Sequence, residues 1–282
     1  MTLPEASSLS GEEKVVVLQH GSAADFLAFA YPTLRLHEHS ANIVLAHALV
    51  RAAGGLPASS TQPTPASNFW LTVWSQHPKS PPVLDIALSC IESPTFGNYP
   101  VFVWTPAEQG VQAPQWLDRR IGAVAGHLQA CVAPERVFAV FGITALVTTF
   151  AEAWTALTGF QVNPKPLYKA FFAVCTPETL KLTASAAQCG ARRATMRDLE
   201  AAARLCHDFA DGSEYPLSLA DATAEARQLI DKGQLWVGTL MGEIASICAV
   251  TRTSLHVSGI TKVHMHRFSQ LQKRGAMAWH KL

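Results

Sequence analysis

The order in which strands and helices are predicted constrains this chain more than any single motif does. A short β-branched strand at 14–18 is followed by two helices, at 26–36 and 40–53, and then by three strands. The same order returns from about residue 192, again as one strand, two helices and three strands. The repeat predicts an α/β fold (α+β, with a mixed sheet) made of two units of one topology.

We place the two tandem units at 1–178 and 179–282. In the first unit the later elements are expected to be strands at 69–76, 83–91, 99–105, 137–143 and 168–176, with helices near 117–128 and at 145–157. In the second unit a weak strand at 192–194 is expected to precede helices that begin after Thr195 and Ser218, and strands at 234–240, 243–251 and 256–264. The second unit is therefore expected to contain only the first six elements of the series.

Local patterns support several of these elements. Apolar residues recur at helical spacing in the stripe Leu117, Ile121, Val124 and Leu128. Ser22 and Thr195 each precede an aspartate by three residues, which is the pattern of a helix-capping box. Gly242 and the residue before it are short enough to join two strands as a hairpin. Pro32 is expected to kink or divide the first helix, and the residues expected to serve core packing are Trp70, Trp74, Trp104, Trp154 and Cys206.

The bulk composition excludes several classes of protein. Of the 282 residues 49% are hydrophobic and 15% are charged, which predicts a sizeable buried core rather than disorder. A formal charge of +1 gives no electrostatic attraction to nucleic acid or to an anionic membrane. The first residues lack the pattern of a secretory signal, and the six cysteines contain no C-x-x-C pair. We therefore expect a cytoplasmic protein with reduced thiols.

Taken together, the element order over about 14–266 and the strand phrase Ile260-Thr261-Lys262-Val263 resemble the GNAT superfamily of acyl-CoA N-acyltransferases. In that family two helices follow the first strand, and the acyl-CoA site lies where the fourth and fifth strands splay apart. The resemblance implies that the strand end at Val263, His264 and Met265 pairs with the pantetheine arm. A phosphate loop of the form Gln/Arg-x-x-Gly-x-Gly/Ala follows that strand in the family, and the matching segment here is Gln272, Lys273, Arg274, Gly275, Ala276 and Met277.

The function implied by the resemblance is transfer of an acyl group, with acetyl-CoA as the expected donor, to a small-molecule or peptide amine. Backbone amides at a helix N-terminus would hold the pyrophosphate, and glycine permits the close approach. No catalytic residue is assigned, because Glu243 is only one of many possible proton acceptors. No metal site is predicted either, since the pair His264 and His266 lacks a third ligand placed by spacing.

Two departures from the family pattern weaken the expected site. Met277 occupies a position that the family gives to a small residue, and only five residues follow it, too few for a stable supporting helix. We therefore expect the second unit to be truncated after its fourth strand and to bind acyl-CoA weakly or not at all. The first unit is expected to be degenerate, because Pro106 and Pro114 remove amide donors from the corresponding loop. The alternative function is a non-catalytic pseudo-enzyme or scaffold that forms a homo-oligomer through unpaired strand edges.

Overall fold

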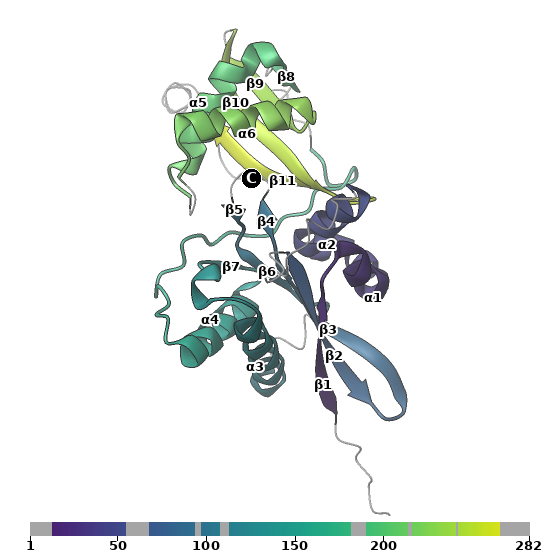
Figure 1. Cartoon of the computed structure of the whole chain (residues 1–282). Coiled ribbons are helices and arrows are strands. Elements are labelled where there is room, and N and C mark those ends of the chain that lie inside the picture. Colours follow the sequence, from purple (N-terminus) through teal and green to yellow (C-terminus); the bar gives the residue numbers. More distant parts are fainter. Residues whose placement is uncertain are drawn as a thin grey trace, which may run out of the picture. The chain divides into compact units, whose positions relative to one another are not determined.

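The fold is taken from a computed structural model, which describes residues 13–54, 68–93, 97–107, 113–181, 190–213, 216–240 and 242–265. The chain divides into two compact units, Met1–Asn163 and Pro164–Leu282 (Figure 1). This division falls before the boundary at 178 that we predicted from sequence. The α/β class with mixed sheets is confirmed. Among the described helices, none combines the length and the apolar character that crossing a membrane requires.

The first unit is organised around a five-stranded sheet of order β1-β2-β3-β6-β7. Its strands are β1 (Lys14–His20), β2 (Phe69–His77), β3 (Ser80–Cys90), β6 (Val101–Trp104) and β7 (Val140–Phe141). Neighbouring strands are antiparallel except β6 and β7, which are parallel. Two further short strands, β4 (Glu92–Ser93) and β5 (Gly97–Asn98), pair only with each other.

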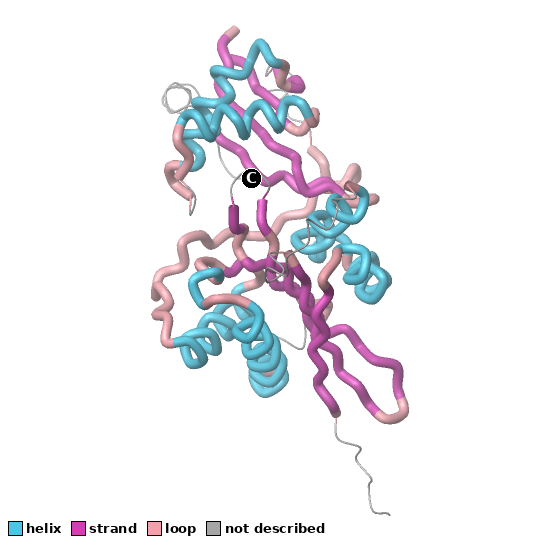
Figure 2. Tube along the Cα trace, in the orientation of Figure 1, coloured by secondary structure: helices cyan, strands magenta, loops and turns pink. Residues whose placement is uncertain are grey.

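Helices cover both faces of this sheet, so that the first unit has three layers (Figure 2). On one face α1 (Ala23–Leu36) and α2 (Glu38–Ala53) pack against Trp70, Phe102 and Trp104. On the other face α3 (Pro114–Cys131) and α4 (Thr144–Thr158) pack against the opposite side of the same strands. The predicted stripe of α3 is confirmed, because Leu117, Ile121, Val124 and Leu128 are all buried there.

Local sequence signals explain how α1 begins and continues. The Ser22 hydroxyl accepts a hydrogen bond from the Asp25 backbone N–H at 3.1 Å and so caps the first turn. The helix then runs through Pro32 to Leu36, so of the two expected effects the division of the helix is wrong, and a kink at Pro32 stays a prediction. A proline within a helix removes one backbone donor, and here the packing of Phe26, Ala30 and Leu34 in the core holds the helix together.

The second unit contains an antiparallel four-stranded sheet of order β11-β10-β9-β8. The strands are β8 (Gly190–Arg193), β9 (Leu235–Leu240), β10 (Glu243–Thr253) and β11 (Ser258–Met265). Both α5 (Leu199–Ala210) and α6 (Leu219–Asp231) pack on one face, against a core that includes Val237, Ile247 and Ala249 (Figure 1). The predicted hairpin between β9 and β10 is confirmed, and Gly242 in its turn has φ +86°.

Two predicted strands are corrected by the structure. The strand expected at 137–143 is reduced to Val140–Phe141, because a 3₁₀ turn at Pro134–Arg136 precedes it and α4 begins at Thr144. The strand expected at 168–176 is absent, and the segment forms neither helix nor strand. A strand needs a hydrogen-bonding neighbour, and no described strand lies alongside this one.

Candidate functional site

The strand end that the sequence singled out lies at the edge of the sheet in the second unit. β11 pairs with β10 on one side, and no described strand pairs with it on the other. Met265 is the last residue of β11 and lies opposite Ser246 of β10. The predicted residues Gln272, Lys273, Arg274, Gly275, Ala276 and Met277 lie outside the described residues.

Val263 and His264 point to opposite faces of the sheet, as neighbours on a strand must. His264 lies opposite Ile247, on the face that the helices cover, and its ring contacts Phe209 of α5 edge-on with 6.4 Å between ring centroids. Val263 points to the other face and is 63% exposed. The two residues therefore cannot act on the same face of a ligand.

The sheet face opposite the helices carries a row of side chains that crosses all four strands. Arg193 of β8 lies beside Trp236 of β9, Trp236 beside Cys248 of β10, and Cys248 beside Val263 of β11. The Arg193 guanidinium carbon lies 5.5 Å from the centroid of the Trp236 ring, within the range of a cation–π contact. We call this row the open face, because none of the described helices of the unit packs against it.

On the helix-covered face a buried lysine lies beside the predicted residues. Lys262 of β11 forms an ion pair with Glu225 of α6, with 2.5 Å between Nζ and Oε2. Its ammonium also lies 5.0 Å from the centroid of the Phe209 ring. Sequence reasoning missed this pair, although a lysine inside an apolar-leaning strand is a signal that could have revealed it.

Cys206 of α5 belongs to the same core and carries no nucleophilic role there. Burial raises the pKa of its thiol to about 11. The positive charge of Lys262 lowers this pKa, and Glu225 raises it further. The thiolate is the nucleophilic form of cysteine, and it is scarce at neutral pH when the pKa is this high. The prediction that Cys206 serves packing is confirmed.

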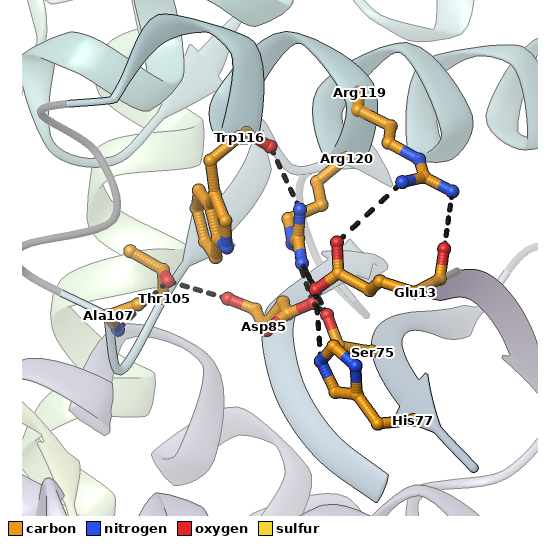
Figure 3. A network of polar contacts seen from close by, with 9 residues as sticks. All are labelled: Glu13, Ser75, His77, Asp85, Thr105, Ala107, Trp116, Arg119 and Arg120. Carbon is orange, nitrogen blue, oxygen red and sulfur yellow. Dashed lines mark hydrogen bonds and ion pairs between the residues drawn. The ribbon is translucent and has the colours of Figure 1, made fainter. Parts of the chain in front are cut away.

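A second cluster of polar groups is buried in the first unit, between α3 and the sheet (Figure 3). Its centre is Arg120, whose side chain is 1% exposed. Arg120 Nε donates to Asp85 Oδ2 at 2.7 Å, and Nη2 donates to Glu13 Oε1 at 2.5 Å and to the Ser75 hydroxyl. The guanidinium carbon lies 4.3 Å from the centroid of the Trp116 ring. These contacts join α3 to β2, to β3 and to the residue before β1.

At the rim of this cluster Glu13 lies close to two further basic side chains, those of Arg119 and His77. Arg119 Nη1 lies 3.7 Å from Glu13 Oε2, and His77 Nε2 lies 3.6 Å from Oε1. Burial alone would raise the pKa of Glu13, but hydrogen bonds from Ser75 and Arg120 and the charges of Arg120 and His77 lower it. Glu13 therefore stays ionised and serves as a partner of the arginines.

The Arg120 cluster has the features of a structural ion-pair network that holds α3 against the sheet, and not those of a catalytic site. Its three central groups, Arg120, Asp85 and Ser75, are buried and hydrogen-bonded to one another, so no substrate atom reaches them. Sequence reasoning missed the cluster. The available signals were an aspartate inside the apolar strand 83–91 and an arginine on the same stripe as Leu117 and Val124.

Among the residues that the structure describes, no three His, Cys, Asp or Glu side chains are grouped so as to hold a metal ion. In comparisons with known proteins, no family model and no curated protein sequence matched the chain.

Proposed function

We propose that this chain has the framework of a GNAT-type N-acyltransferase, in two tandem units. The observation that carries the proposal is the arrangement of elements in each unit. A first strand is followed by two helices that pack on the same face of the sheet, and antiparallel strands follow. In the first unit the fourth sheet strand, β6, also pairs in parallel with the fifth, β7, after the crossover helix α3. The resemblance noted in the sequence attaches this arrangement to acyl transfer from coenzyme A.

The proposed donor strand is β11 of the second unit. Pantetheine carries amide groups, and an edge strand offers backbone N–H and C=O groups to which such amides can bond. β11 meets this requirement, because β10 occupies only one of its sides among the described strands. A backbone N–H near Met265 would polarise the thioester carbonyl, which a neutral amine attacks directly to displace the coenzyme A thiolate.

The pyrophosphate of the donor is assigned to the backbone amides of residues 272–277. Gly275 lets the phosphate approach the backbone more closely than a Cβ would permit. Lys273 and Arg274 add positive charge to the same segment. Met277 stands where the family has a small residue, so we expect weak binding of acetyl-CoA.

The first unit is not proposed as a donor site. A Cβ placed on Gly142 would lie 2.5 Å from the Val103 carbonyl oxygen, so the backbone after β7 comes very close to β6. This close approach leaves no room for a pantetheine arm between the two strands at that level. The absence of a small-residue phosphate loop between 106 and 115 supports the same conclusion.

Calorimetry with acetyl-CoA and the full chain tests the donor site. We expect a dissociation constant well above the micromolar range, and at least tenfold weakening for Gly275→Val. Ala278→Val, just beyond the segment, is the matched control and should leave the affinity unchanged. Pantetheine, which lacks the pyrophosphate, should bind Gly275→Val and the parent chain equally.

Transfer itself is measured as release of free coenzyme A thiol in the presence of a panel of small amines and peptides. Amine-dependent release that is lower in Gly275→Val than in Ala278→Val would support the proposal. Micromolar affinity for acetyl-CoA would show that the segment is not defective. Neither binding nor thiol release at millimolar acetyl-CoA would overturn the enzyme proposal.

A non-catalytic interaction protein is the second candidate, and the open face favours it. Trp236, Ile260 and Val263 are exposed apolar side chains of the second unit. Large exposed apolar patches are typical of surfaces at which proteins interact. Under this candidate acetyl-CoA does not bind. The substitution Trp236→Asp then changes the oligomeric state of the chain but leaves its fold intact.

A further inference from the structure

Three side chains with metal-binding atoms converge on the surface of the first unit, where the end of β1 passes α3. His127 and Cys131 belong to α3 and are half-buried, and Gln19 of β1 is exposed. His127 Nε2 lies 3.2 Å from Gln19 Oε1. Cys131 Sγ lies 3.3 Å from the same oxygen atom. An imidazole nitrogen and a thiol sulfur therefore lie close to one amide oxygen.

The packing of the first unit holds these three side chains together. Residues four positions apart are neighbours on the surface of an α-helix, so His127 and Cys131 lie on one side of α3. Leu128 anchors the same turn of α3 in the core. Gln19 follows Val17 by two residues, and alternate residues of a strand share a face. Because Val17 packs against the core that α3 also covers, the Gln19 side chain lies on the α3 side of the sheet.

The separations between these atoms match those between the ligands of a tetrahedral zinc ion. Zinc binds nitrogen at about 2.0–2.1 Å, oxygen at about 2.0–2.2 Å and thiolate sulfur at about 2.3 Å. Tetrahedral geometry then places nitrogen and oxygen about 3.4 Å apart, and oxygen and sulfur about 3.6 Å apart. The two distances to Gln19 Oε1 are each within about 0.3 Å of these values. A zinc ion therefore fits after only small shifts of the side chains.

The chemistry of the three groups also favours zinc over harder cations. Imidazole and thiolate are ligands of zinc, whereas calcium and magnesium prefer sets of oxygen atoms. Two helical side chains four residues apart also bind one zinc ion in the His-Glu-x-x-His motif. We propose that His127, Cys131 and Gln19 bind a zinc ion. Solvent supplies the fourth ligand, since Gln19 is exposed and the two side chains of α3 are only half-buried.

This site departs from the expectation that the chain binds no metal. Two of its ligands are a histidine and a cysteine, but the third is a glutamine. The spacing His127-x-x-x-Cys131 is visible in the sequence, whereas Gln19 lies 108 residues before His127. Spacing along the chain therefore does not reveal the third ligand.

Zinc binding exchanges one proton for one metal ion. The metal ligand is the thiolate, so the Cys131 thiol releases its proton to solvent as the zinc–sulfur bond forms. His127 binds through the lone pair of Nε2, and the proton of the neutral ring is then carried by Nδ1. Because the ligands come from β1 and α3, the bound ion joins two elements of the first unit. The inference does not rest on acyl transfer.

Calorimetry with zinc chloride and the full, reduced chain tests the site. We expect a dissociation constant in the micromolar range, which rises at least tenfold in His127→Ala and in Cys131→Ser. His39→Ala and Cys175→Ser each remove an exposed residue of the same type elsewhere in the chain. These matched controls should bind zinc like the parent chain, and circular dichroism verifies that all four variants fold.

The third ligand is tested by changing its charge. Gln19→Glu introduces a carboxylate, which attracts a divalent cation more strongly than a neutral amide does, so it should lower the dissociation constant for zinc. Gln19→Leu removes the oxygen ligand and should raise that constant. If Gln19 served only to accept hydrogen bonds, Gln19→Glu would leave the affinity for zinc unchanged, and this result would remove Gln19 from the site.

Alkylation of the parent chain tests the site without any substitution. Zinc should slow the modification of Cys131 by iodoacetamide at least tenfold, because the bound thiolate is no longer free to react. Cys175, in the same sample, should react at an unchanged rate. Peptide mass spectrometry measures both rates, so the test remains valid even where a variant fails to fold.

Three outcomes would overturn the proposal. Zinc could fail to bind at millimolar concentration, or His127→Ala and Cys131→Ser could bind zinc as tightly as the parent chain. Zinc could also leave the alkylation of Cys131 as fast as before. Weaker binding in both variants, together with selective protection of Cys131, supports the site whether or not the chain binds acetyl-CoA.

Discussion

Asp85 lies in the centre of a buried strand, where a carboxylate is tolerated only with a matching cation. Arg120 supplies that cation from α3, with a 2.7 Å contact between Nε and Oδ2. Removing one partner of a buried ion pair leaves the other charge without solvent or counter-charge, and this costs more than the pair contributes as a whole. The Arg120 cluster is therefore a point of sensitivity in the first unit.

We expect Asp85→Ala to lower the free energy of unfolding by about 3 kcal/mol, because Arg120 then stays buried with only Glu13, at the rim of the cluster, as a counter-charge. Urea denaturation measures the loss. Asp118→Ala, at an exposed position of the same helix α3, should change the stability by less than about 0.5 kcal/mol. The double variant Asp85→Leu, Arg120→Met should recover much of the loss, and a double variant as unstable as Asp85→Ala would contradict this account.

A second carboxylate, Asp198, makes the stability of the second unit depend on pH. Hydrogen bonds from Arg192 lower the pKa of Asp198 far below the ordinary 3.8. Burial raises this pKa, and hydrogen bonds from Thr195 lower it further. The capping box predicted at Thr195 is confirmed, with Asp198 Oδ2 accepting from the Thr195 backbone N–H at 2.7 Å. Because folding lowers the pKa of Asp198, the ionised carboxylate stabilises the folded unit at pH values above the pKa that Asp198 has in the unfolded chain.

That stabilisation should disappear as the pH falls from about 5 to below 2, where the carboxylate becomes protonated in both states. We expect Asp198→Asn to flatten the decline of unfolding free energy over this acid range. Arg192→Gln, which removes the main hydrogen-bond donor, should have the same effect. Chemical denaturation at several pH values measures both, and a decline as steep as in the parent chain would show that Asp198 does not cause it.

At the scale of elements, residues close in sequence carried most of the predictable information. The stripe from Leu117 to Leu128, the cap at Ser22 and the hairpin at Gly242 were found because their partners are a few residues away. Arg120 and Asp85 were missed because their meeting depends on β3 and α3 being brought together across 35 residues. The strand predicted at 168–176 was wrong for a related reason, since alternation identifies a strand-forming segment but not its neighbour.

The close contact at Gly142 shows how a neighbouring strand can restrict which residue is tolerated at a position. The backbone after β7 approaches β6 so closely that an added Cβ would lie 2.5 Å from the Val103 carbonyl oxygen. Backbone cannot move aside as a flexible side chain can, so any side chain larger than that of glycine at position 142 would displace one of the two segments.

We expect Gly142→Ala to lower the free energy of unfolding by about 1–3 kcal/mol, because the methyl group overpacks the junction of β6 and β7. Gly122→Ala, within α3, meets no atom within 4 Å and should stabilise the chain by about 0.5–1 kcal/mol. Thermal or urea unfolding of the two variants checks the opposite signs. Equal effects would show that the contact with Val103 is relieved at no cost.

At the scale of the whole molecule, each unit places a different kind of side chain opposite an alanine on a neighbouring strand of its sheet. In the first unit Trp104 lies opposite Ala87 and packs in an aromatic core. In the second unit Lys262 lies opposite Ala249 and pairs with Glu225. A buried ion pair contributes little net stability compared with apolar packing, and the first unit holds one as well, between Arg120 and Asp85.

The five described cysteines are distributed over both units, so their reactivity tests the packing of each unit. Burial raises the pKa of Cys90 and of Cys206 to about 11, so only about one thiol in a thousand is ionised at pH 8. Cys175 is exposed. In dilute protein we expect iodoacetamide to modify Cys175 first and to modify Cys90 and Cys206 only after unfolding, as followed by peptide mass spectrometry. Rapid modification of Cys90 in the native chain would contradict the packing of the first unit.

The Arg120 cluster also has a consequence for folding during synthesis, because its charged groups leave the ribosome at different times. Asp85 emerges from the exit tunnel 35 residues ahead of Arg120, and Glu13 emerges 107 residues ahead of it. At a synthesis rate of about 5–20 residues per second, Asp85 waits about 2–7 s for its counter-charge. During that interval, burial of β3 would leave the Asp85 carboxylate without a cation, and this cost disfavours closure of the nascent sheet. We therefore expect the first unit to close only after α3 has been synthesised.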